Sequence, residues 1–175
     1  DSRDNCNAII HTSSETLVIG CRNSTIPEGV KKIGGAAFCF CSNMNEIDFP
    51  STLIEIGGEA FSYTSLDKVI IPASVTSIAE NSFYGVGLTS IVVDEENTVY
   101  DSREGCNGII ETATNKLILG CSNTTIPEGV EVIGAFAFTS GWDSEKVLSI
   151  PSSVKSIEGN AFYHGMTSGL KEVVC

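Results

Sequence analysis

The cysteines are the residues whose type and spacing in this sequence could do chemistry. Four of the seven bound two related stretches, CNAIIHTSSETLVIGC over 6–21 and CNGIIETATNKLILGC over 106–121. Two others, Cys39 and Cys41, form a C-x-C in AFCFCSNM, without the C-x-x-C spacing and further ligands of a zinc site. We therefore interpret Cys39 and Cys41 as structural residues and expect no metal site.

Histidines and acidic residues add few candidates for catalysis. The chain has two histidines, His11 and His164, and neither has a partner at a spacing typical of a nucleophile or a metal motif. It contains no G-x-S-x-G, no phosphate-binding loop and no dinucleotide fingerprint. The acidic run Asp94–Asn97 is either a calcium-binding stretch, although it lacks EF-hand spacing, or a solvated turn. We predict that the protein is not an enzyme and carries no cofactor.

Two nested repeats define the elements that must position these residues. Residues 1–38 align with 101–138 without gaps and with more than half of the positions identical, so a long cassette is duplicated. A shorter unit, I-P-x-x-V-x-x-I-x-x-x-A-F, starts at Ile26, Phe49, Ile71, Ile126 and Ile150. Repeats of about 20–29 residues are typical of solenoids of the leucine-rich-repeat size. We therefore predict a single solenoid over 1–175, in which each coil buries its apolar face against its neighbours.

Each short unit is expected to contain a strand, a second extended piece and a compact bend. Alternation of apolar residues predicts strands at Met44–Pro50, Leu66–Pro72, Leu88–Asp94 and Lys146–Pro151. The V-x-x-I stretch should cover the opposite wall of the coil. The phenylalanine that closes each unit should stack on the next, which predicts an aromatic ladder of Phe38, Phe61, Phe83, Phe138 and Phe162.

The two cysteine-bounded stretches are expected to form β-hairpins, inserted at about 5–22 and 105–122. Each has an apolar run, a polar turn and a second apolar run. A turn at Ser13–Ser14 would place Ile10 opposite Leu17.

The same register would make the bounding cysteines face each other, Cys6 opposite Cys21 and Cys106 opposite Cys121. Facing cysteines on paired strands are close enough to form a disulfide. Two disulfides and two pairs of buried thiols are both open interpretations, because a register slip of one residue would separate the partners. The odd number of cysteines leaves at least one thiol unpaired.

Composition limits the classes of partner. Apolar residues make up 42% and charged residues 18%, which is typical of a globular protein. The net charge of −12 argues against nucleic acid and against an anionic membrane surface. It leaves open a cationic partner or a plain acidic surface. No apolar run approaches the roughly 18–20 residues that span a bilayer. We interpret the chain as a fragment from which a signal or an anchor was removed, so any membrane contact would run through an anchor outside it.

The repeated unit, with its L-x-x-I-x-I-P strands, resembles the BspA-like leucine-rich-repeat family over nearly the whole chain. These proteins are largely bacterial cell-surface proteins. The resemblance implies a β-rich solenoid: a right-handed superhelix with a parallel sheet on its concave side, short helical bends and the two hairpin inserts. It also implies an extracellular or cell-surface location and a role in adhesion. No catalytic residues are carried over.

In such a solenoid, the residues between the inward apolar positions of each strand face the concave side. This gives a candidate partner-binding face of Glu46, Asp48, Lys68, Ile70, Ser90, Val92, Val147 and Ser149, continued by Glu172 and Val174. Ile70 and Val92 would form an apolar stripe, which is either part of an interaction surface or an ordinary exposed pair. Trp142 is either a binding hot spot or a cap on its coil.

Two hypotheses for the function follow. The first is a non-enzymatic secreted or cell-surface module that binds a protein or glycan on a host or neighbouring cell through its concave face. The alternative is a structural spacer in a larger surface protein, with no ligand of its own.

Overall fold

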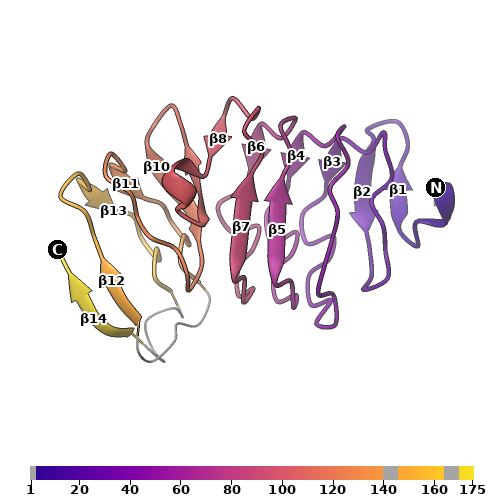
Figure 1. The fold of residues 1–175 in the computed structure, drawn as a ribbon. Coiled ribbons are helices and arrows are strands. Elements are labelled where there is room, and N and C mark those ends of the chain that lie inside the picture. The colour runs from indigo at the N-terminus through magenta and orange to yellow at the C-terminus, as the bar shows by residue number, and fades with distance from the viewer. Residues whose placement is uncertain (1–2, 140–145, 164–169) are drawn as a thin grey trace.

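The computed structural model describes residues 3–139, 146–163 and 170–175, and these form a β-solenoid (Figure 1). The coils follow one another along one axis, so the two termini lie at opposite ends of the molecule (Figure 1). The elements are η1 (Arg3–Asn5), β1 (Ile9–His11), β2 (Thr16–Ile19), β3 (Lys32–Ile33), β4 (Glu55–Ile56), β5 (Lys68–Ile71), β6 (Ser77–Ile78), β7 (Ser90–Val93), β8 (Tyr100–Asp101), η2 (Arg103–Gly105), β9 (Gly108–Glu111), β10 (Lys116–Gly120), β11 (Val132–Ile133), β12 (Lys146–Ser149), β13 (Ser156–Ile157) and β14 (Leu170–Val174). The predicted β-rich solenoid is confirmed.

The V-x-x-I stretches form the longer sheets. One sheet has the order β1-β2-β3-β4-β6, with parallel pairing from β2 onward. The other has the order β13-β11-β10-β9-β8. Each contains one predicted hairpin as an antiparallel pair, β1–β2 (hairpin 1) and β9–β10 (hairpin 2). The second extended piece of each coil is therefore a hydrogen-bonded wall whose isoleucines, such as Ile33 and Ile56, point into the core.

The wall expected to be concave is less regular than the sequence predicts. Three of the predicted strands are present as β5, β7 and β12, but Met44–Pro50 forms no strand. β5 pairs with β7 and β12 pairs with β14, both in parallel, as two separate two-stranded sheets. The parallel pairing agrees with the expected parallel sheet, but among the described residues the two pairs do not join into one sheet. Hairpin 2 lies against β7, in the place where the strand of another coil would continue the parallel pairing.

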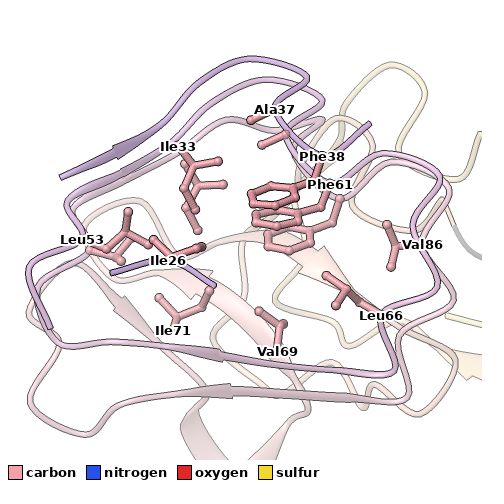
Figure 2. Packing of buried hydrophobic residues seen from close by; sticks show 14 of the residues in the cluster. Ile26, Ile33, Ala37, Phe38, Leu53, Phe61, Leu66, Val69, Ile71 and Val86 are labelled. Atoms are coloured by element: carbon pink, nitrogen blue, oxygen red, sulfur yellow. The ribbon is translucent and has the colours of Figure 1, made fainter. Parts of the chain in front are cut away.

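The predicted aromatic ladder is present in two sections. Phe61 stacks between Phe38 and Phe83, with ring centroids 5.2 and 5.3 Å apart. Phe138 stacks on Phe162 at 5.2 Å. Figure 2 shows the rings of Phe38 and Phe61 lying one above the other inside the coils, beside aliphatic side chains from both walls. Since no coil encloses its own rings, the stack is stabilised by contacts between neighbours.

Hairpin 2 is the wall between two apolar clusters. One face carries Ile109, Ile118 and Leu119, which join the cluster built by the preceding coils. The other face carries Ile110 and Leu117, which join the cluster built by the coils that follow. The ladder is interrupted at this wall, between Phe83 and Phe138.

The bends are not helical, which corrects the expectation of short helical bends. The 3-10 elements η1 and η2 are the only helices among the described residues. The bends before Phe38, Phe61 and Phe138 instead each contain a residue with positive φ, namely Ala36 (56°), Glu59 (57°) and Phe136 (58°). A residue in this left-handed region cannot continue a right-handed helix, so the chain reverses there instead of winding on.

Both hairpins contain the same bulge. Ile10 pairs with Leu17 as predicted, but Ile9 pairs with Ile19, so Val18 has no partner across the ladder. In hairpin 2 the register shifts in the same way between Leu117 and Leu119. A bulge adds one residue to one strand, so every pair beyond it moves by one position.

Candidate functional site

Six residues of the predicted partner-binding face lie together on three consecutive coils. Parallel pairing of β5 and β7 sets Lys68 beside Ser90 and Ile70 beside Val92. Glu46 and Asp48 lie on the preceding coil, and both are exposed. Ile70 and Val92 are among the exposed large hydrophobic residues. The expected apolar stripe therefore exists as two neighbouring side chains on paired strands.

A shallow hollow of about 590 Å³ lies over this part of the face. Its lining includes Glu46, Asp48, Lys68 and Ile70 from the predicted set. Asp67 and Asp94 also line it, so four carboxyl side chains surround one lysine. The hollow therefore combines Ile70, one of the two residues of the apolar stripe, with a strongly acidic rim, which favours a partner that presents a basic group beside apolar surface.

The remaining predicted residues lie on a different sheet. Val147 pairs with Glu172, and Ser149 pairs with Val174, across β12 and β14. All four are exposed. Hairpin 2 separates this pair of strands from β5 and β7, so the predicted face consists of two patches.

The bounding cysteines do not form the disulfides considered above. Cys21, Cys106 and Cys121, all in the described part of the chain, carry free thiols. The bulge explains this, because the shifted register puts Asn7, and not Cys6, beside Cys21, with Asn7 Nδ2 3.0 Å from Cys21 Sγ. In the second copy Asn107 Nδ2 lies 3.2 Å from Cys121 Sγ. The predicted facing of the cysteines is therefore wrong.

The thiols of the two hairpins differ in acidity. A hydrogen bond from Ser24 Oγ, 3.6 Å from Cys21 Sγ, lowers the pKa of Cys21, with the Asn23 backbone acting in the same direction. Burial raises the pKa of the Cys106 thiol. Burial also raises the pKa values of Cys39 and Cys41. Cys21 is consequently the thiol of this group with the greatest thiolate character.

The other candidate groups have structural roles. Among the described residues, no three His, Cys, Asp or Glu side chains gather as a metal site would require. Asn97 is buried and holds the turn that follows β7, since its Nδ2 donates to Pro72 O at 2.8 Å and its Oδ1 accepts from Val99 N at 2.9 Å. His11 lies at the tip of hairpin 1 with Nδ1 2.7 Å from Ser14 Oγ. His164 and Trp142 lie outside the described residues.

A second aromatic row, outside the core, was missed by the sequence analysis. Phe40 and Tyr63 stack at 4.9 Å, and Tyr84 meets Tyr63 edge-on at 5.4 Å. Phe136 and Tyr163 extend the row from Tyr84. Burial, with a smaller contribution from Tyr63, raises the pKa of Tyr84 to about 12. The signal was present: an aromatic residue stands two positions after Phe38 and Phe61 in consecutive repeats.

Comparison with known proteins gives the following findings. The family model described as "BspA type Leucine rich repeat region" matches residues 18–107 and 108–173, in six copies. No curated protein matches the chain. None of the helices in the described part is long and apolar enough to cross a membrane.

Several solved structures have the same fold. A leucine-rich cell surface protein from Faecalibacterium prausnitzii is 28% identical, with a TM-score of 0.72 over 86% of this chain and 40% of its own. The pneumococcal vaccine antigen PcpA is 24% identical, with a TM-score of 0.71 over 85% of this chain and 38% of its own. A leucine-rich repeat protein from Eubacterium ventriosum is 20% identical, with a TM-score of 0.53 over 85% and 58%. The chain thus spans less than two thirds of each of these proteins.

Proposed function

Because this chain belongs to the BspA-type leucine-rich repeat family, we propose that it is a non-enzymatic, extracellular binding module that attaches its parent protein to a protein or glycan of another surface. Membership of this family and the likeness to a leucine-rich cell surface protein support a protein-interaction module. Adhesion, the surface location and the site are the parts that we propose.

The observation that carries the proposal is the hollow beside β5 and β7. Ile70 and Val92 are exposed next to each other. Apolar side chains at such exposed positions add no stability to the monomer. The four carboxylates around Lys68 give the same place a strong negative potential. An apolar centre with a charged rim is the usual anatomy of a protein-binding site. We therefore assign the partner contact to this patch, with a basic and apolar segment as the preferred ligand.

The spacer remains the second candidate. A leucine-rich solenoid holds its two ends apart through neighbour contacts alone, and the opposite positions of the termini suit that role (Figure 1). The two functions can be distinguished because only the binding module needs the surface of β5 and β7 to contact a partner.

Binding of the purified chain to immobilised matrix proteins and glycans tests the proposal. The Ile70→Ser/Val92→Ser variant removes the stripe, and Ile54→Ser, an exposed isoleucine before β4, is the matched control. We expect saturable binding that the stripe variant weakens at least about tenfold, as for a residue at the centre of an interface, and that the control leaves unchanged. Binding that survives in the stripe variant would remove the site assignment, and no binding to any ligand would favour the spacer.

A further inference from the structure

Cys41 lies against the last residues of hairpin 1, close to Cys21. Cys41 Sγ is 4.0 Å from the backbone oxygen of Gly20, the residue that precedes Cys21. A carbonyl oxygen lies close to the next Cα across a planar trans peptide, so Cys41 Sγ is within about 7 Å of the Cys21 Cα. Both cysteines are free thiols in the structure. Two thiols from different layers of the solenoid are therefore neighbours.

Backbone contacts hold both chain segments in place. Gly20 N donates to Ala37 O at 2.9 Å, in the bend that leads to Cys41. A Cβ at Gly20 would lie 2.0 Å from Phe38 Cε1, so the hairpin packs directly on this ring. Cys41 N donates to Phe38 O at 3.0 Å. The proximity of the two cysteines thus follows from the packing of hairpin 1 on the bend and not from the sulfur atoms.

The acidities of the two thiols agree with this arrangement. Burial raises the pKa of Cys41, and the charge on Cys21 raises it further. Ser24 and the Asn23 backbone lower the pKa of Cys21. Asn7 Nδ2, 3.0 Å from Cys21 Sγ, is a further donor to this sulfur. Cys21 is therefore the thiol that ionises first, with a protonated Cys41 beside it.

The other cysteines near this pair are less well placed. The bulge in hairpin 1 moves Cys6 out of register with Cys21. Burial raises the pKa of Cys39, and the charge on Glu59 of the following coil raises it further, so this thiol lies toward that coil. The charge on Cys39 also raises the pKa of Cys41, but by less than Cys21 does. Cys21 and Cys41 are therefore the pair that the fold favours.

The second cassette has only one half of this pair. Cys121 corresponds to Cys21 and has the same asparagine donor, with Asn107 Nδ2 3.2 Å from its sulfur. The residue that corresponds to Cys41 is Gly141, which lies outside the described residues. Hairpin 2 is therefore a natural control, with the first thiol and without the second.

We propose that Cys21 and Cys41 are a redox pair that forms a disulfide between hairpin 1 and the following coil, with a low-molecular-weight disulfide as the oxidant. The Cys21 thiolate attacks one sulfur of the oxidant, forms a mixed disulfide and releases one small thiolate. Cys41 then loses its proton, attacks Cys21 Sγ and releases the second small thiolate. The protons of both cysteines pass to the two released thiolates. Two protein thiols are thus oxidised, and one small disulfide is reduced to two thiols.

The bond closes residues 22–40 into a loop and ties hairpin 1 to the bend of Phe38. Such a loop restricts the unfolded chain and so stabilises the folded one. The pair lies apart from the hollow beside β5 and β7, whose lining includes neither cysteine. The inference is therefore independent of the partner contact proposed above.

Oxidation of the reduced protein with oxidised glutathione, followed by tryptic mapping without reduction, tests the pairing. Trypsin cuts after the basic residues between Cys21 and Cys41, so their bond joins two separate peptides. The Cys6→Ser/Cys39→Ser variant removes the other thiols of these two peptides, and circular dichroism checks that it is folded. We expect the joined peptides to be the main oxidised product in this variant and in the unsubstituted chain.

The Cys41→Ser variant tests the second step of the reaction. It keeps the first step, so Cys21 should retain bound glutathione at a level at least about tenfold above that in the unsubstituted chain. Cys121, which has no second thiol, should enter no cross-link in either protein. A stable glutathione adduct on Cys21 in the presence of Cys41, a bond between Cys39 and Cys41, or no oxidation at all would overturn the proposal.

Thermal unfolding is a readout that does not depend on mapping. Oxidation should raise the melting temperature of the unsubstituted protein, and reduction should restore the original value. The melting temperature of Cys41→Ser should not rise on oxidation. A cross-linked protein that melts no higher than the reduced one would mean that the fold must distort to form the bond, and the proposed pair would then be wrong.

Discussion

Hairpin 1 and hairpin 2 have related sequences and the same bulge, but different surroundings. Both keep a buried inner face, made by Ile10 and Leu17 in the first copy and by Ile110 and Leu117 in the second. Their outer faces differ, because a coil covers hairpin 2 and none of the described residues covers hairpin 1. The local sequence thus determines the shape of each hairpin, and the neighbouring coil determines whether its outer apolar residues contribute to stability.

The largest difference is expected for an isoleucine of the outer face. Ile109→Ala should lower the free energy of unfolding by about 3 kcal/mol, because it leaves a cavity in a packed cluster. Ile9→Ala, its matched variant, should change it by less than about 0.5 kcal/mol. Urea unfolding at low protein concentration measures both. Equal losses would show that the outer faces are equally packed in solution.

The two hairpins should respond alike where each meets a ladder phenylalanine. A Cβ at Gly20 would lie 2.0 Å from Phe38 Cε1, and one at Gly120 would lie 2.3 Å from Phe138 Cε1. Both rings are buried, so Gly20→Ala and Gly120→Ala should each cost about 1–3 kcal/mol through overpacking. Thermal unfolding of the two variants checks this. A large loss in one variant alone would contradict the shared packing.

The two hairpins also differ in their ion pairs, because only hairpin 2 has a lysine, Lys116, at this position. Its Nζ contacts Glu80 and lies 2.7 Å from Glu158 Oε2, whereas hairpin 1 has Thr16 at this position and Gly57 in place of Glu158. Lys116→Thr should cost about 1 kcal/mol, since both carboxylates are partly exposed and screened by solvent. Thr16→Lys is the matched control and should gain nothing comparable.

The loss in Lys116→Thr should depend on pH. The hydrogen bond from Lys116 lowers the pKa of Glu158 below its usual 4.5, with help from the Ala135 N–H. The pair therefore stabilises the folded state above about pH 4.5, and this contribution is lost as the pH falls through the lowered pKa. Denaturant titrations of the protein and the variant should differ at pH 7 and converge toward pH 3. A difference that persists at pH 3 would mean that Lys116 acts by packing.

The smallest perturbation is a chemical label on the thiols. Cys21 has a lowered pKa and is partly exposed, whereas Cys106 and Cys121 are buried. Iodoacetamide should therefore modify Cys21 at least about tenfold faster than either of them, because the thiolate is the reacting species. Peptide mapping by mass spectrometry gives the rates. Similar rates would indicate that hairpin 2 opens as readily as hairpin 1.

The repeat spacing correctly predicted the features that recur in every coil. It did not predict local departures from the repeat, such as the bulge in each hairpin. The period gave the coils and the ladder of Phe38, Phe61 and Phe83, because an apolar residue at a fixed place in every coil must be buried. It could not give the bulge at Val18. The run LVIG is apolar on both faces of its strand, so alternation does not fix the register there.

The bends and the partner-binding face were also only partly predictable from the repeat spacing. Ala36, Glu59 and Phe136 carry positive φ without being glycine, so no residue type marks the reversal. The eight predicted face residues were taken from the alternation within each predicted strand. Six of them share a patch because β5 pairs with β7, while Val147 and Ser149 lie beyond hairpin 2. The sequence indicated which side chains face out, but not that a hairpin would divide them.

The position of hairpin 2 between two apolar clusters has a mechanical consequence. If the chain is pulled from its C-terminal end, coils detach one at a time, because each is held only by its neighbours. The detachment then reaches hairpin 2, whose strands bond to each other and whose far side is anchored among Ile109, Ile118 and Leu119. Extension stops there until a larger force breaks both sets of contacts. The hairpin thus divides the solenoid into two parts. Under tension the C-terminal part unfolds first, and the N-terminal part unfolds only at the larger force.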